Sequence, residues 1–135
     1  MAEGASKGAS PFGAEARLHR REQIELVKSR GQSEVGRHTV VVVLADPPEG
    51  SRRLACLISR RFDLHAVVRN RARRLFRETW RALFPRLSPC WVLLIPRRAL
   101  KSAKCPEILA EVERVLVKRG VCRAQADDGE TGLAN

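Results

Sequence analysis

Residues 66–84, AVVRNRARRLFRETWRALF, carry the strongest pattern in this chain of 135 residues. Apolar and small side chains recur with the 3.6-residue period of a helix, and they are Val68, Ala72, Leu75, Phe76, Thr79 and Leu83. Beside them runs a row of arginines four residues apart, Arg69, Arg73, Arg77 and Arg81, which Arg71 and Arg74 widen. Like charges at this spacing destabilise a helix by roughly 0.2–0.5 kcal/mol per pair. The stretch therefore predicts a helix that packs one side on a core and presents guanidinium groups to an anionic partner.

The positive charge of the chain is concentrated around this helix. The formal net charge is +11, and residues 52–98 hold 13 arginines, no lysine and two acids, Asp63 and Glu78. The remainder of the chain is balanced, so the excess is a local surface feature that indicates a polyanionic partner. Arginine forms forked contacts with phosphate and stacks on bases, which lysine does not do. Glu78 is expected to form an intrahelical salt bridge with Arg74 or Arg81.

Three apolar runs surround the helix and read as strands. Residues 38–45, HTVVVVLA, and 53–59, RLACLIS, are rich in β-branched and apolar residues, and we expect them to pair as a hairpin across the turn at residues 46–50. Pro85 ends the helix, and residues 90–96, CWVLLIP, form a third strand. The order strand, helix, strand predicts a crossover that places the basic helix over a sheet.

The ends of the chain complete an α+β fold with a central sheet. Residues 17–30 predict a helix that stops at Gly31, and residues 107–119 predict a last amphipathic helix. We therefore expect a disordered tail at residues 1–16, one domain at residues 17–121 and a flexible tail at residues 122–135. Because no apolar run is long enough for a membrane span or a signal peptide, the expected compartment is the cytoplasm.

The sequence offers no catalytic or metal centre of its own. Metal-dependent cleavage of phosphodiesters needs clustered carboxylates, whereas the aspartates are scattered at Asp46, Asp63, Asp127 and Asp128. The four cysteines lack the spacing of a zinc site, and the three histidines have no partner at a telling spacing. The aromatic residues are expected mainly in the core, although Phe62 and Trp80 flank the basic surface and are the two that we would test for stacking on bases.

The basic helix resembles a known signature. Residues 66–80, AVVRNRARRLFRETW, resemble the RNR motif of the protein subunit of bacterial ribonuclease P, a consensus A-V-x-R-N-R-x-K-R-x-x-R-E that follows a strand ending in two basic residues. Here that strand end is Ser59-Arg60-Arg61. The similarity covers roughly residues 17–119 and includes the helix ending in Gly31, the WVLLIPRR strand at residues 91–98 and the terminal helix.

This resemblance implies a fold and a function. The family fold is a compact two-layer α/β sandwich with a left-handed βαβ crossover, which is an exception to the right-handed rule. The family protein binds a large catalytic RNA, and the complex removes 5′ leaders from precursor tRNAs. The RNA, with bound Mg²⁺, carries out the hydrolysis, and the protein contacts the leader through a cleft. By position, the residues implied to contact the RNA subunit are Arg60, Arg61, Arg69, Asn70, Arg71, Arg73, Arg74 and Arg77.

The chain departs from the family pattern at the leader cleft. Family members commonly have aromatic residues on the first helix, and the matching positions here are Ile24 and Lys28. Lys28 retains the ability to bind phosphate, whereas stacking of leader nucleotides is not expected there. Arginine also replaces lysine at most basic positions, which preserves the charge.

Two other classes of protein are compatible with a basic helix. One is a non-catalytic RNA-binding protein, such as a ribosomal protein or an RNA chaperone, and RNA that co-purifies with the chain would discriminate it. The other is a DNA-binding regulator, but a helix-turn-helix needs a short helix directly before the recognition helix. A strand precedes it here, so DNA is not an expected partner.

Overall fold

The computed structural model describes residues 11–13, 16–18 and 20–124. Its elements are α2 (Arg21–Arg30), β1 (Gln32–Val35), β2 (Thr39–Ala45), β3 (Arg52–Cys56), α3 (Ala66–Leu83), the 3₁₀ turn η2 (Phe84–Arg86), β4 (Cys90–Pro96), the 3₁₀ turn η3 (Arg98–Ser102) and α4 (Cys105–Lys118). The strands form one mixed sheet in the order β1-β2-β4-β3. The predicted α+β class with a central sheet is confirmed.

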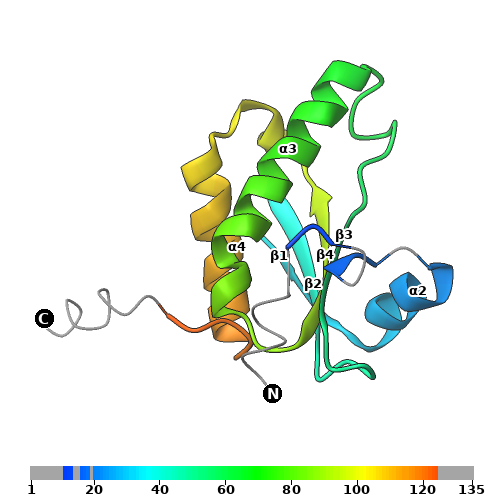
Figure 1. The fold of residues 1–135 in the computed structure, drawn as a ribbon. Coiled ribbons are helices and arrows are strands. Elements are labelled where there is room, and N and C mark those ends of the chain that lie inside the picture. The colour runs from blue at the N-terminus through cyan, green and yellow to red at the C-terminus, as the bar shows by residue number, and fades with distance from the viewer. Residues whose placement is uncertain (1–10, 14–15, 19, 125–135) are drawn as a thin grey trace, which may run out of the picture.

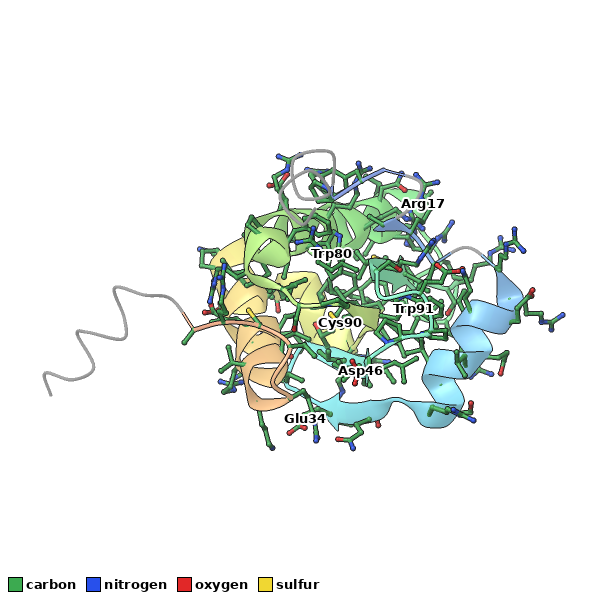
Figure 2. The ribbon with its side chains drawn as sticks, turned by 60° about the horizontal axis from the view of Figure 1, so that its bottom comes forward. Arg17, Glu34, Asp46, Trp80, Cys90 and Trp91 are labelled. Carbon is green, nitrogen blue, oxygen red and sulfur yellow. The ribbon has the colours of Figure 1, made fainter. Side chains whose placement is uncertain are left out.

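Helices cover both faces of this sheet (Figure 1). On one face α3 and α4 enclose the larger core, to which Phe76, Trp80, Leu83 and Leu116 contribute. On the other face α2 buries Val27 against Trp91 and Leu93. Successive residues of β4 point to opposite faces, so Cys90 lies on the side of α3 and α4 and Trp91 on the side of α2 (Figure 2).

The predicted hairpin between the first and second apolar runs, residues 38–45 and 53–59, is wrong, because β2 and β3 are not neighbours in the sheet. β2 pairs antiparallel with β4, and β3 pairs parallel with β4 on its other side. β4 is buried from Cys90 to Leu94, and a strand that is apolar on both faces belongs in the middle of a sheet. Because α3 connects the parallel strands β3 and β4, the predicted crossover unit is present.

Sequence patterns missed the edges of the sheet. β1 has the polar sequence QSEV, is mostly exposed, and pairs antiparallel with β2. The predicted helix at residues 17–30 starts too early, since α2 begins at Arg21. Arg17 instead forms a parallel bridge with Leu54, and the amide of Leu18 donates to the carbonyl of Leu54 at 2.9 Å. This short segment covers the free edge of β3.

Both ends of the predicted domain also extend further than the expected limits at residues 17 and 121. Ala16 is buried and Phe12 packs on the core, although both fall in the stretch expected to be a disordered tail. Cys122 is buried and bridges to Leu87, and the amide of Arg123 donates to the carbonyl of Arg86. Residues 1–10, 14–15 and 125–135 of the two expected tails lie outside the described residues.

Gly31 ends α2 for a reason of space. Its φ of −74° is open to any residue, but an added Cβ would lie 2.5 Å from the carbonyl oxygen of Val27 and 3.0 Å from that of Val43. Real Cβ atoms do not approach other atoms this closely. Gly31 therefore lets the chain turn tightly from α2 into β1 against the sheet.

Candidate nucleic-acid interface

Helix α3 is amphipathic in the way its period predicts. Its buried residues are Ala72, Phe76, Thr79, Trp80 and Leu83, while Val68 and Leu75 are half-buried at the margin. On the other side Arg73, Arg74, Arg77 and Arg81 are exposed. The helix is 18 residues long, which corresponds to about 27 Å. It therefore presents a rigid cationic edge, anchored from behind by the sheet.

The exposed side chains of α3 enclose a shallow groove of about 300 Å³, which we call the arginine groove. It is lined by Asn70, Arg73, Arg74, Arg77, Glu78 and Arg81. The Oδ1 atom of Asn70 accepts a hydrogen bond from Nη1 of Arg73 at 3.1 Å, so Asn70 orients that guanidinium. Glu78, the one acid in this lining, pairs with Arg81 at 3.6 Å, which is one of the two partners expected for it. Exposed pairs of this kind contribute little to stability, and the groove keeps a large positive excess.

Two arginines of the motif also hold the fold. Nη1 of Arg69 donates to the carbonyls of Asp63 at 3.0 Å and Leu64 at 2.9 Å, in the loop before the helix. Arg71 reaches a different segment, η3 and the residue after it. Its Nη1 donates to the carbonyl of Lys101 at 3.1 Å, and its Nη2 donates to the carbonyl of Ala103 at 2.6 Å. Arg69 and Arg71 are half-buried and lie outside the arginine groove.

Arg60 and Arg61 are exposed in the loop that leads from β3 to α3. Arg61 lines a second hollow, of about 290 Å³, together with Phe62 and Arg98. The ring of Phe62 is already covered by the ammonium of Lys101, whose Nζ lies 5.3 Å from the ring centroid. The basic residues before the helix thus continue its cationic surface around one end.

A cleft of about 450 Å³ lies beside the arginine groove, and we call it the α2 cleft. It is lined by Pro11, Phe12, Gly13, Ala16, Arg17, Leu18, Ile24, Leu54, Ala55, Cys56, Leu57, Arg73 and Arg77. Ile24 takes part in this lining, whereas Lys28 is exposed one turn further along α2 and does not. Arg73 and Arg77 belong to both linings, so they form the wall that the cleft shares with the arginine groove.

The structure adds an aromatic residue to the cleft that the sequence patterns did not single out. The ring of Phe12 lies under two guanidinium groups, with Cζ of Arg77 4.5 Å and Cζ of Arg81 5.1 Å from its centroid. The carbonyl of the neighbouring Pro11 accepts a hydrogen bond from Nε1 of Trp80 at 3.0 Å. The available signal was a lone aromatic residue beside a proline in a stretch otherwise rich in glycine, alanine and serine.

Trp80, by contrast, is not a platform for bases. Its side chain is only 2% exposed and packs edge-on against Phe84, with 5.6 Å between the ring centroids. In Figure 2 it lies beneath the surface of α3, on the core side. The proposal to test Trp80 for stacking is therefore wrong, and the broader expectation of aromatic residues in the core is confirmed for Phe76, Trp80, Phe84 and Trp91.

The α2 cleft contains one thiol with a strongly shifted pKa, that of Cys56. Burial raises the pKa of the Cys56 thiol in the α2 cleft to about 12, despite the nearby charges of Arg73 and Arg77. A thiol with such a pKa stays protonated at neutral pH and is a poor nucleophile. Within residues 11–13, 16–18 and 20–124, no group of histidine, cysteine and acidic side chains is arranged to hold a metal ion. None of the helices described there is long and apolar enough to cross a membrane.

Comparison with known proteins assigns a family to this arrangement. The sequence model of the family described as Ribonuclease P matches residues 12–120. The Ribonuclease P protein component of Symbiobacterium thermophilum is 32% identical over 110 residues, which cover 81% of this chain and 95% of that protein. The corresponding protein of Roseiflexus castenholzii is 32% identical over 117 residues, covering 83% and 92%.

Solved structures show the same fold. The RNase P protein of Staphylococcus aureus superposes with a TM-score of 0.70 at 22% identity, over 80% of this chain and 98% of that one. The RNase P protein from Thermotoga maritima gives a TM-score of 0.64 at 23% identity, over 74% and 94%. The family match spans the arginine groove, the α2 cleft and the sheet between the helices. This chain therefore belongs to the Ribonuclease P family of proteins.

Proposed function

We propose that this chain is the protein component of a ribonuclease P holoenzyme. It binds a catalytic RNA subunit and the 5′ leader of precursor tRNA, and it assists removal of the leader to give the mature 5′ end. The RNA subunit, with bound Mg²⁺, supplies the hydrolytic chemistry. The protein supplies positively charged surface that holds two polyanions next to each other, in the cytoplasm.

The observation that carries this proposal is the shared wall of two adjacent surfaces. Arg73 and Arg77 line both the arginine groove and the α2 cleft. Guanidinium groups can donate to phosphates on either side because each carries five N–H donors in a planar fork. A folded RNA on the groove and an extended leader in the cleft would thus be held against the same two side chains.

The role that we assign to each residue follows from the exposure of its side chain. Arg60, Arg61, Arg73, Arg74 and Arg77 are exposed and are assigned to phosphates of the RNA subunit. Asn70 orients Arg73 and adds a polar contact. Arg69 and Arg71 use part of their donors to fix the ends of the surface and offer the remaining donors to RNA.

The contacts available in the α2 cleft suit an extended nucleic-acid strand of any base sequence. Its lining is mostly apolar, with the guanidinium groups of Arg17, Arg73 and Arg77 at its edges. Phosphate contacts position a nucleic acid without reading its bases. Ile24 lines the cleft, and we assign the exposed Lys28, which lies outside this lining, to phosphates of the leader. This arrangement suits a protein that must accept many precursors.

Reconstitution tests the proposal directly. The chain is mixed with the ribonuclease P RNA of the same genome, and 5′-end maturation of a precursor tRNA is followed at low Mg²⁺. We expect the wild-type protein to stimulate cleavage at the mature 5′ end, and the double variant Arg73→Glu/Arg77→Glu to lose binding to the RNA by at least about a hundredfold, since several phosphate contacts are lost or reversed. Protein freed of RNA is expected to cleave nothing.

A matched control separates local from global charge. The variant Arg37→Glu/Arg114→Glu changes the net charge by the same amount, at two exposed arginines of the β1–β2 turn and of α4. It should retain most of the binding. Equal losses in the two double variants would mean that net charge alone attracts the RNA and that the arginine groove is not its binding surface.

A further inference from the structure

Two aliphatic side chains, three residues apart in the sequence, are exposed where the loop before α3 joins the helix. Among the described residues, four large hydrophobic side chains are exposed: Val35, Leu64, Val67 and Val117. Leu64 is 72% exposed at the end of the loop, and Val67 is 74% exposed in the first turn of the helix. We call these two residues the apolar tip. In Figure 1 this end of α3 and its loop project beyond the sheet, at the top of the view.

The loop that carries the apolar tip is held by a dense set of hydrogen bonds. Oδ1 of Asp63 accepts from the backbone amide of His65 at 2.8 Å and contacts its Nδ1 at 2.8 Å. Oδ2 of Asp63 pairs with Nζ of Lys101 at 3.0 Å. The bonds from His65 and the pair with Lys101 hold the pKa of Asp63 well below its usual range. From the other side, Arg69 binds the carbonyls of Asp63 and Leu64.

Because these contacts hold the loop in place, the exposure of Leu64 is a feature of an ordered segment. A leucine on an ordered loop that points into water gains no burial in the folded protein, whereas a partner that covers it would add favourable apolar burial. Leu64 on this hydrogen-bonded loop and Val67 on the first turn of α3 therefore present apolar side chains to solvent at one end of the helix. The apolar tip is thus available to a partner that buries it.

The charges around the tip identify the chemistry of that partner. Arg60 and Arg61 are exposed just before it, and Arg74 is exposed just after it on the same helix. The nearby acid, Asp63, is neutralised by Lys101. Apolar side chains flanked along the chain by exposed arginines match a surface that combines apolar faces with negative charge, and unpaired nucleobases between phosphates have this composition.

Continuity with the arginine groove decides between RNA and other anionic partners. Val67 and Arg74, which lines the groove, are seven residues apart on one helix, so they lie on the same face about 10 Å apart along its axis. A nucleic acid in the groove therefore reaches the tip within a few nucleotides. We propose that Leu64 and Val67 pack against exposed nucleobases of the RNA subunit while the arginines hold the neighbouring phosphates; this rests on the proposed function.

Salt titration distinguishes an apolar contact from an ionic one. Affinity for the ribonuclease P RNA is measured from about 50 to about 200 mM salt, where ionic contacts weaken steeply. For Leu64→Ser/Val67→Ser we expect roughly a tenfold loss at every salt concentration with an unchanged slope, because the lost burial involves no counterions. The control Val35→Ser/Val117→Ser makes the same kind of change at two exposed valines elsewhere and should stay within about twofold of wild type.

The outcomes separate this inference from the proposed function. If wild-type protein binds the RNA and the tip variant binds equally well, the apolar tip is not an RNA contact and the proposed function is untouched. If the tip variant instead abolishes self-association of the free protein and leaves RNA binding unchanged, the tip is a contact between two copies and the inference is wrong. Leu64→Phe provides a second reading, since an aromatic ring that stacks on a base should bind at least as tightly as leucine.

Discussion

At the scale of single residues, the arginines of one motif have different roles: some face solvent and others bind backbone carbonyls. Arg74 points into solvent and lines the arginine groove. Arg71, three residues earlier, turns toward η3 and donates to the carbonyls of Leu100, Lys101 and Ala103. The same side chain can thus contact a partner or replace a missing backbone donor, and only its surroundings decide which role it takes.

This difference predicts that the same substitution lowers stability much more at Arg71 than at Arg74. Arg71→Ala should lower the free energy of unfolding by about 1.5–3 kcal/mol, because charged donors to three backbone carbonyls, two of them in partly buried hydrogen bonds, are lost. Arg74→Ala should change it by less than about 0.5 kcal/mol while weakening RNA binding. Urea unfolding followed by circular dichroism measures both. Comparable unfolding midpoints for the two variants would show that Arg71 does not anchor η3.

At the scale of elements, α4 anchors the start of β2 through one carboxylate. Glu111 is buried, and its Oε2 accepts from the backbone amides of His38 at 3.0 Å and Thr39 at 2.9 Å, while Oε1 lies 2.8 Å from Nδ1 of His38. Gly36 makes room for this, since an added Cβ would lie 2.2 Å from Oε2 of Glu111. The last helix and the first long strand, 72 residues apart, are joined at this point.

Removing the charge of Glu111 should therefore destabilise the sheet. Glu111→Gln keeps the size of the side chain but turns an amide group toward backbone donors, and we expect a loss of about 2–4 kcal/mol in the free energy of unfolding. Glu78→Gln is the control, since Glu78 is exposed and makes one loose pair. Hydrogen exchange at the amide of Thr39 gives a local readout, and unchanged protection there would contradict the assignment.

At the scale of the whole molecule, positive charge gathers on the side of α3 that faces away from the sheet. The groove, the cleft and the loop before the helix are all lined by arginines of residues 17–98. Such a surface binds nucleic acid with release of counterions, and each phosphate that is neutralised adds roughly 0.7–0.9 to the slope of log affinity against log salt concentration. The slope therefore counts the arginines that meet phosphates.

For wild-type protein and the RNA subunit we expect a slope of roughly 3.5–4.5, from the exposed arginines assigned above to its phosphates, Arg60, Arg61, Arg73, Arg74 and Arg77. Arg74→Gln should lower the slope by roughly 0.7–0.9, and Arg114→Gln on α4 should leave it unchanged. Filter binding or fluorescence anisotropy over a salt series provides the measurement. A slope near 1 would show that the exposed arginines do not contact phosphate.

Strong local patterns predicted the centre of the fold, and weak ones failed at its edges. α3 and β4 were placed almost to the residue because an amphipathic period and an unbroken apolar run leave few alternatives. β1 was missed because an exposed edge strand needs no apolar residues. The hairpin was predicted wrongly because the most apolar strand takes the centre of the sheet. That strand is β4, which comes later in the chain and lies between β2 and β3.

The sequence by itself determined that a cationic helix would pack on a sheet, since the apolar period and the arginine row are local properties of residues 66–84. Tertiary structure alone decided which arginines face solvent and which bind carbonyls. It also brought Phe12 beneath Arg77 and Arg81, and so gave the α2 cleft an aromatic side chain that α2 lacks. These contacts join residues more than sixty positions apart, and their geometry depends on the packing of the whole chain, which no local pattern encodes.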